Sequence, residues 1–313
     1  MSRRLARAAA LCWLGVLLAT SGACGGAFHG SPQPAALVPA GAVTRHVVVV
    51  SIDGLRPDAI PFARARTLER LMQEGAHAAE ARTIFPSWTL PSHTSMITGV
   101  GVETHGINWN TNLTGIHGVV GVPTMLELAR TAGLHTATFL GKRKLLHLLR
   151  PGSLDHALYP RTEVYLAADQ VVEAAVRYLQ FERPNLLFVH LPDPDLAGHL
   201  FGWMRFPYRW NVRRADQAVR ALWEASQRAF GEDFVLIVTA DHGGHGRTHG
   251  TAAELDMRIP WIAWGRGVSP GTISAPIQTY DTAATALWLL GVPVPAEWEG
   301  RPVRSAFSAA DAP

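Results

Sequence analysis

The chain has 313 residues, of which 48% are hydrophobic and 17% are charged; this composition can supply one large core and excludes a mostly disordered protein. There are 28 basic and 25 acidic residues, so the formal net charge is +3. Because three of the arginines stand within the first seven residues, the remainder is electrically balanced, and we expect no binding to nucleic acid.

The first 24 residues predict a secretory signal peptide. Arg3 and Arg4 precede an apolar stretch, Ala8 to Ala19, that is too short for a membrane span. Small residues then lead to Cys24, and this junction resembles a bacterial lipoprotein cleavage site. We therefore expect an exported protein of the periplasm or cell envelope. Lipidation of Cys24, ordinary cleavage nearby and an uncleaved membrane anchor are the alternatives for the mature N-terminus.

Residues 25–44 are rich in Gly, Pro and Ala and predict a flexible linker, which leads into one domain at 45–310. In chain order, the predicted elements of this domain are a strand at 46–52, helices at 62–75, just after 89 to near 99, and 123–132, a strand at 136–140, a helix at 166–181, a strand at 186–191, a helix at 210–230, strands at 234–239 and 261–264, and a helix at 282–290. Strands that alternate with helices predict an α/β fold, here a three-layer α/β/α sandwich with a mostly parallel central sheet.

Three acidic residues stand just beyond three of the predicted strands. Asp53 follows the strand at 46–52, Asp195 lies beyond that at 186–191, and Asp241 follows that at 234–239. The carboxyl ends of parallel strands meet at one edge of a sheet. Three carboxylates there would repel one another and raise their pKa values unless cations bind them. This pattern predicts a metal site at that edge.

Histidines accompany these acids. His199 is four residues after the second acid, one helical turn away, and His242 is adjacent to the third. His249 lies in a glycine-flanked turn, and His245 nearby is an alternative to it. Ligands that mix carboxylate with imidazole suit zinc or a related divalent transition metal better than calcium or magnesium.

Thr89 stands where a helix is predicted to begin. Pro91 fits the first turn of that helix, and Gly99 marks its end. A hydroxyl group at a helix N-terminus lies among free N–H groups and a positive dipole end, which stabilise an alkoxide and attract phosphate. Thr89 is therefore a candidate nucleophile, with a simple helix cap as the alternative.

Short motifs follow one another from about Val47 to Val303. They are, in order, Ser51-Ile52-Asp53-Gly54, Phe85-Pro86-x-x-Thr89-x-Pro91-x-His93, Thr98-Gly99, His105-Gly106-Ile107, Pro194-Asp195-x-x-Gly198-His199, Asp241-His242-Gly243 and Gly300-Arg301-Pro302. Together they resemble the nucleotide pyrophosphatase/phosphodiesterase family of the alkaline phosphatase superfamily. The resemblance implies an alkaline-phosphatase-like fold and a phosphoric ester hydrolase that acts through a phospho-threonine on Thr89.

The resemblance also implies two divalent metal ions, usually zinc. The ligands that it implies are Asp195, His199 and His249 for one ion, and Asp53, Thr89, Asp241 and His242 for the other. Asn110 fits the asparagine that orients the substrate in the family, and Asn108 and Asn112 are alternatives. In many relatives the last histidine ligand lies far beyond the Asp-His pair, whereas His249 follows only seven residues on.

The expected substrate is a small phosphate diester or pyrophosphate. A phosphomonoesterase generally binds the extra negative charge with a further cation, and no arginine stands beside Thr89 in the sequence. A sulfatase needs Cys or Ser at this position and an arginine where His93 stands. A non-catalytic metal-binding lipoprotein with the same fold is the remaining alternative.

Overall fold

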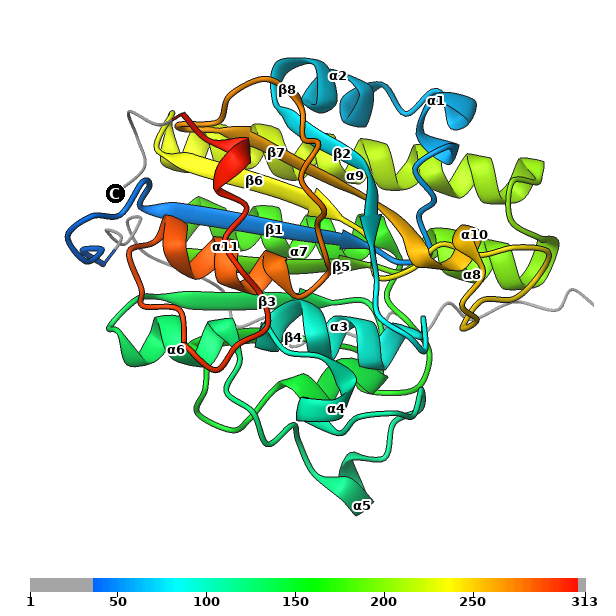
Figure 1. The fold of residues 1–313 in the computed structure, drawn as a ribbon, viewed down its shortest axis with the longest axis horizontal. Coiled ribbons are helices and arrows are strands. Elements are labelled where there is room, and N and C mark those ends of the chain that lie inside the picture. The colour runs from blue at the N-terminus through cyan, green and yellow to red at the C-terminus, as the bar shows by residue number, and fades with distance from the viewer. Residues whose placement is uncertain (1–35, 309–313) are drawn as a thin grey trace, which may run out of the picture.

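The computed structural model describes residues 36–308. The predicted signal peptide, Cys24 and most of the predicted linker lie outside these residues. The described chain forms an eight-stranded sheet in the order β4-β3-β5-β1-β6-β7-β2-β8, covered by helices on both faces (Figure 1). The strands are β1 (His46–Ile52), β2 (Ala76–Arg82), β3 (Thr136–Leu140), β4 (His156–Leu158), β5 (Leu186–Leu191), β6 (Phe234–Thr239), β7 (Arg258–Gly265) and β8 (Gly271–Thr272).

The helices complete the predicted three-layer sandwich, which is confirmed. They are α1 (Ala59–Ala63), α2 (Arg66–Glu74), α3 (Thr89–Thr98), α4 (Val102–His105), α5 (Thr114–His117), α6 (Met125–Thr131), α7 (Ala168–Phe181), α8 (Asp193–Phe201), α9 (Phe206–Phe230), α10 (Glu254–Met257) and α11 (Asp281–Leu289), with 3₁₀ segments η1 (Arg143–Leu148) and η2 (Arg304–Ala306). Helices α1, α2, α7 and α8 pack with α9 on one face, and α3 and α6 pack with α11 on the other.

The strands β3, β5, β1 and β6 are adjacent and parallel, and their bounds match the prediction. Their Val-, Ile- and Leu-rich runs are buried on both faces, as in other covered parallel sheets. Strand β7 is longer than predicted and runs antiparallel to both neighbours. Strand β2 was not predicted, because its sequence AHAAEAR has no β-branched or aromatic residue.

Two helices differ from their predicted bounds. The helix predicted at 62–75 is divided into α1 and α2, because Arg64 adopts a left-handed conformation with φ of 55° and ends the first piece. Helix α9 begins four residues before the predicted position 210, with Pro207 in its first turn. Pro has no backbone N–H to lose there, so the earlier start is favourable.

The last part of the predicted linker contacts the domain. Val43 is buried, and its N–H donates to Leu289 O over 2.9 Å. Among residues 36–308, no helix has both the length and the apolar character that a membrane crossing needs.

Candidate active site

The three predicted acids meet at one edge of the sheet because the strands before them are neighbours. Asp53 follows β1 directly, Asp241 lies two residues after β6, and Asp195 is in the first turn of α8, just beyond β5. In Figure 1 the arrowhead of β1 points toward this edge, beside α8 and α10. All three side chains are buried. Gly54 permits this approach, since its φ is +71° and a Cβ atom there would lie 3.0 Å from Asp195 Cα.

Two overlapping groups of side chains at this edge can each hold a metal ion. Within each group, one ligand atom per residue lies within 4.8 Å of the others. The groups are Asp195, His242 and His249, and Asp53, Asp241 and His242. His199 joins the first group, since its Nε2 lies 3.3 Å from Asp195 Oδ1 and 3.1 Å from His249 Nε2. The structure therefore brings together all of the predicted acids and histidines, with His242 between the two groups.

The three histidines present the same nitrogen to the centre. Nδ1 donates to a backbone carbonyl in each ring: His199 to Arg247 O, His242 to Gly243 O and His249 to Ser87 O. Such bonds fix the orientation of each ring and direct its Nε2 at the centre, where it can bind a metal ion once it carries no proton. The Nε2 atoms of His199 and His249 lie 3.1 Å apart, an approach that a shared proton or a cation between them stabilises.

The carboxylates also have buried oxygen atoms that nearby cations would stabilise. Asp53 Oδ1, Asp195 Oδ1 and Asp241 Oδ2 are buried and accept no hydrogen bond from residues 36–308. Burial and the nearby charge of Asp53 raise the pKa of Asp241 to about 8. Buried acceptors without donors are costly. Divalent cations would satisfy these oxygens, so the donor set fits the two metal ions that the sequence predicts.

Thr89 is the first residue of α3, and this buried side chain faces the same centre. Its Oγ1 lies 3.4 Å from His242 Nε2. The N-terminus of α3 adds the Leu90 N–H, and all ten residues of the helix are buried. His93 donates from Nδ1 to Thr89 O over 2.8 Å, which fixes the first turn. The hydroxyl is thus held beside a histidine that belongs to both metal groups.

Asn110 is the asparagine that reaches the first turn of α3, which carries Thr89. Its Oδ1 accepts from the Leu90 N–H over 3.0 Å. Asn112 instead accepts from Thr114 and donates to Glu163, while Asn108 is exposed. The geometry therefore favours Asn110 over both alternatives.

His249, and not His245, faces the metal groups. His245 Nδ1 lies 2.7 Å from Asp256 Oδ1, and Asp256 also accepts from the backbone and hydroxyl of Thr251. This network holds the turn that carries His249. Burial, followed by the neighbouring His242 charge, lowers the pKa of His249 to about 3, so its ring is neutral and able to coordinate.

Two lysines were missed by the sequence analysis. Lys142 lies two residues beyond β3, and its Nζ is 2.8 Å from Asp53 Oδ2 and also contacts Asp195 Oδ2. Lys144, on η1, donates to Asn110 Oδ1 over 3.0 Å. The acids were predicted from their position just beyond a parallel strand. The same pattern applies to both lysines, because they follow β3, the next parallel strand of the same sheet.

His190 was also missed, because it lies within the apolar strand β5. Its Nε2 is 2.8 Å from Asp53 Oδ2, while its Nδ1 accepts from the Gly141 N–H. Burial opposes the ionisation of Asp53, but Lys142 and the hydrogen bond from His190 hold the pKa of this carboxyl well below its usual value. His190 thus orients a candidate metal ligand.

The aromatic residues after His199 divide into two groups. Trp203 and Tyr208 are buried and donate to Gly54 O over 3.0 and 2.9 Å, so they support the loop after β1. Phe206 and Trp210 are exposed and stack on each other with ring centroids 6.5 Å apart.

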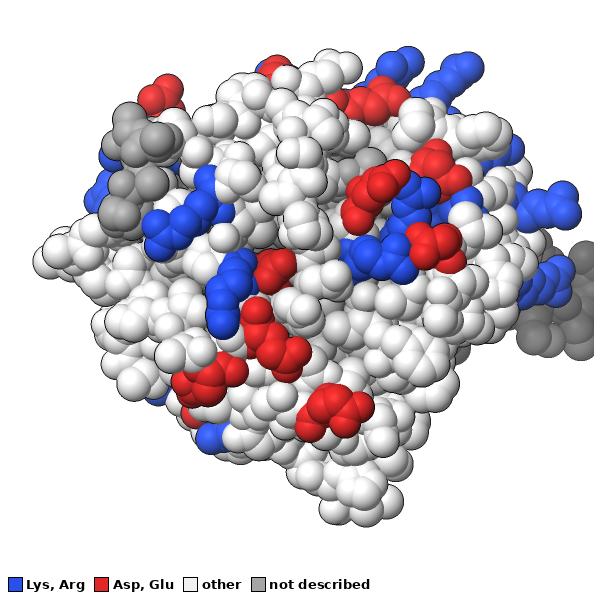
Figure 2. All heavy atoms as spheres, viewed as in Figure 1, with Lys and Arg blue, Asp and Glu red and all other residues white. Residues whose placement is uncertain are grey.

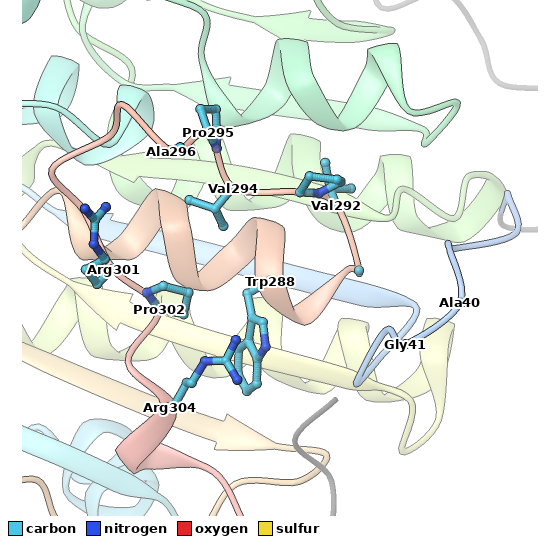
Figure 3. Close-up of a pocket in the computed structure, with 12 residues that line it drawn as sticks. Ala40, Gly41, Trp288, Val292, Val294, Pro295, Ala296, Arg301, Pro302 and Arg304 are labelled. Atoms are coloured by element: carbon cyan, nitrogen blue, oxygen red, sulfur yellow. The ribbon is translucent and has the colours of Figure 1, made fainter.

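Other surface features lie away from this centre. A cavity of about 550 Å³ opens near the C-terminal end of α11, where Figure 3 shows Trp288 beside Arg304. The face shown in Figure 2 mixes basic and acidic side chains over a mostly uncharged surface.

Comparisons with known proteins agree with this geometry. The family model for type I phosphodiesterase/nucleotide pyrophosphatase matches residues 47–252. Venom phosphodiesterase from Macrovipera lebetinus is 28% identical over 227 residues, which cover 67% of this chain and 27% of that protein. GPI ethanolamine phosphate transferase 1 from Gibberella zeae is 24% identical over 313 residues, with 88% of this chain and 30% of that protein covered. The chain therefore spans less than a third of the length of these two relatives.

A solved structure shares the fold. Murine ectonucleotide pyrophosphatase/phosphodiesterase 5, an inactive variant in complex with AMP, superposes with a TM-score of 0.72 at 16% identity. The match covers 84% of this chain and 100% of that one.

Proposed function

Because the chain belongs to the type I phosphodiesterase/nucleotide pyrophosphatase family, we propose that it is a two-metal phosphoric ester hydrolase with Thr89 as nucleophile. The observation that carries the proposal is the position of the Thr89 hydroxyl, 3.4 Å from the nitrogen of His242 that both metal groups share. Asp53, Asp195, Asp241, His199, His242 and His249 would hold the ions, with Thr89 as a further ligand.

Two bound divalent ions would lower the pKa of the Thr89 hydroxyl and of water, and would neutralise charge on the phosphoryl oxygens. Thr89 Oγ1 attacks phosphorus, a bond to Oγ1 forms, and the bond to the leaving oxygen breaks in line with it. The leaving oxygen takes up a proton. Water then cleaves the phospho-threonine and restores the hydroxyl. The Asn110 Nδ2 group would donate to a phosphoryl oxygen during both steps, and the Leu90 N–H would join it once released from Asn110 Oδ1.

Turnover of Thr89→Ala tests the proposal. We expect kcat/KM to fall by about a thousandfold or more with both p-nitrophenyl phosphate and bis-p-nitrophenyl phosphate. Thr98→Ala is the matched control, since Thr98 is buried in the last turn of the same helix and donates to Thr94 O. Full turnover by Thr89→Ala would overturn the proposal.

Metal analysis separates an enzyme from a non-catalytic metal-binding protein. The enzyme should bind about two zinc ions per chain, lose turnover when a chelator removes them and regain it when zinc is restored. Bound metal without hydrolysis of either substrate would favour the non-catalytic alternative.

We also propose that the protein is exported to the periplasm or cell envelope. The support is the sequence of residues 1–24, in which a basic start, an apolar stretch and small residues before Cys24 predict a signal peptide. The mass of the mature N-terminus would distinguish a lipidated Cys24 from ordinary cleavage.

A further inference from the structure

Exposed apolar side chains gather where α8 ends and α9 begins. Of residues 36–308, eleven large apolar residues are exposed, and four of these lie between positions 200 and 210. The four are Leu200 and Phe201 at the end of α8, and Phe206 and Trp210 at the start of α9, each with 51–69% of its surface exposed. Figure 1 shows this junction at the right-hand edge of the view. Apolar side chains concentrated on a surface in this way indicate an interaction site.

Two arginines lie together at the same junction. Arg205 immediately precedes α9, and Arg247 is in the turn that carries His249. The Trp203 N–H donates to Gly246 O over 2.8 Å, so this turn contacts the junction. A Cβ atom built on Gly202 would lie 3.3 Å from Arg205 Cγ and 3.9 Å from Arg247 Cγ. The two side chains therefore start from neighbouring points of the surface.

The charge of these two arginines has no counter-ion within the described chain. Both residues are exposed, and no carboxylate of residues 36–308 lies within 4.0 Å of either guanidinium group. The two segments that form the junction, 196–215 and 242–253, contain no Asp or Glu. Asp58 on the loop before α1 is already paired with Arg56. Although the whole chain is nearly balanced in charge, this part of its surface is both apolar and cationic.

We propose that this surface docks on an anionic phospholipid membrane. The docking patch consists of Leu200, Phe201, Arg205, Phe206, Trp210 and Arg247. Apolar and aromatic side chains enter the boundary between headgroups and acyl chains, where tryptophan is favoured. Guanidinium groups bind phosphate oxygens through paired N–H donors, so a layer of lipid phosphates complements the two arginines. The proposal depends neither on the proposed function nor on lipidation of Cys24.

A second copy of the chain fits the docking patch less well. In a dimer with twofold symmetry the same surface lies on both sides of the contact. Arg205 and Arg247 would then face the same two residues of the other copy, and the segments around them offer no carboxylate. Like charges brought together in this way are unfavourable. The charge of the patch therefore favours a membrane over self-association.

Docking would also orient the candidate active site. His199 directly precedes Leu200, its side chain is 43% exposed, and its Nδ1 donates to Arg247 O. One histidine of the first metal group is thus joined to both the apolar and the cationic part of the patch. A protein docked through this patch would hold that metal group close to the headgroup layer.

Trp210 supplies a probe for the first experiment, because it is the one exposed tryptophan of residues 36–308. Phosphatidylglycerol vesicles with brominated acyl chains should quench the fluorescence of the wild type, and Trp210→Phe should remove most of that quenching. The difference reports insertion of the patch and not an anchor elsewhere in the chain. Thr89→Ala should be quenched like the wild type, so this result is separate from the test of the nucleophile. Equal quenching in wild type and Trp210→Phe, or none in either, would overturn the inference.

The second experiment titrates the quenching with increasing amounts of phosphatidylglycerol. Arg205→Gln should weaken docking about fivefold, and Phe206→Ser about tenfold. Arg228→Gln, exposed at the other end of α9, and Ile116→Ser, exposed on α5, are the matched controls and should dock like the wild type. Vesicles of phosphatidylcholine alone should bind more weakly than anionic ones.

Two results of this titration would contradict the inference. One is the same affinity for all four variants. The other is self-association, measured by sedimentation velocity without lipid, that Phe206→Ser abolishes while vesicles cause no quenching. That second result would assign the patch to a contact between two copies of the chain.

Discussion

Buried polar groups at the two ends of the parallel strands differ in whether their hydrogen bonds are satisfied. At the amino end, the Asn185 side chain is fully buried, accepts from the His135 N–H and donates to Ala36 O and Arg45 O. At the carboxyl end, one oxygen of each of the three carboxylates accepts no hydrogen bond from the described residues. Satisfied polar groups hold a fold together, whereas unsatisfied ones at the ends of four parallel strands indicate a ligand site.

The largest effect that this comparison predicts is at Asp241. Asp241 Oδ1 accepts from the Gly54 and His242 N–H groups, and Asn can keep both bonds. We expect Asp241→Asn to lower kcat/KM about a thousandfold or more, while the metal-free variant unfolds at the same or a higher temperature, because one repelling carboxylate is gone. A loss of metal-free stability with activity retained would place Asp241 among the structural groups.

The opposite result, a loss of stability with activity retained, is expected at Asn185. Asn185→Ala removes three hydrogen bonds and leaves buried backbone groups unpaired, so we expect the free energy of unfolding to fall by about 3 kcal/mol. Urea denaturation measures this fall. The folded variant should keep its kcat/KM and its zinc content. A variant of normal stability, or one that loses zinc, would contradict the distinction between the two ends.

A smaller effect is expected at His190, which lies at the functional end but does not face the metal groups with a free nitrogen. His190→Gln should weaken zinc binding about 10- to 100-fold through loss of its bond to Asp53. Competition with a zinc-binding dye gives the affinity. His135→Gln, at the opposite end of the sheet, serves as the control and should leave the zinc affinity unchanged.

The smallest effect concerns pH at the amino end. His46 stacks on Phe230 with centroids 4.0 Å apart, and burial lowers the pKa of His46 to about 4. In the unfolded chain this histidine binds a proton near its ordinary pKa of 6.5. The stability that its neutral form contributes is therefore present above pH 6.5 and lost as the pH falls from there toward 4. Between pH 7 and pH 4, the free energy of unfolding of His46→Phe should fall by about 2 kcal/mol less than that of the wild type, as measured by urea unfolding.

Much of the fold could be predicted because β1, β3, β5 and β6 are continuous apolar runs that end at acids or turns. Because strands alternate with helices, the sheet was predicted to be parallel, and the acids were therefore expected to meet at the edge formed by the carboxyl ends of the strands. Strand β2 could not be predicted, since its alanines carry no strand signal and its pairing with β7 is a tertiary contact. The break at Arg64 also depends on packing, because nothing local marks a left-handed residue there.

Within the candidate site, side chains of the expected chemical type were easier to predict than those that support them. The acids and histidines stood in recognisable motifs. The lysines belong to no such motif, and His190 lies in a strand whose other residues are apolar, so neither has a local signal. Both omissions concern the charge balance of the site, which depends on which strands are neighbours and not on local spacing.

Acid quenching during steady-state hydrolysis of p-nitrophenyl phosphate, followed by peptide mass spectrometry, is the most direct test of the central claim. In zinc-loaded protein we expect one phosphoryl group covalently bound at Thr89, and we expect chelation to abolish it. Turnover with the phosphoryl group on another residue, or undiminished turnover in Thr89→Ala, would contradict it.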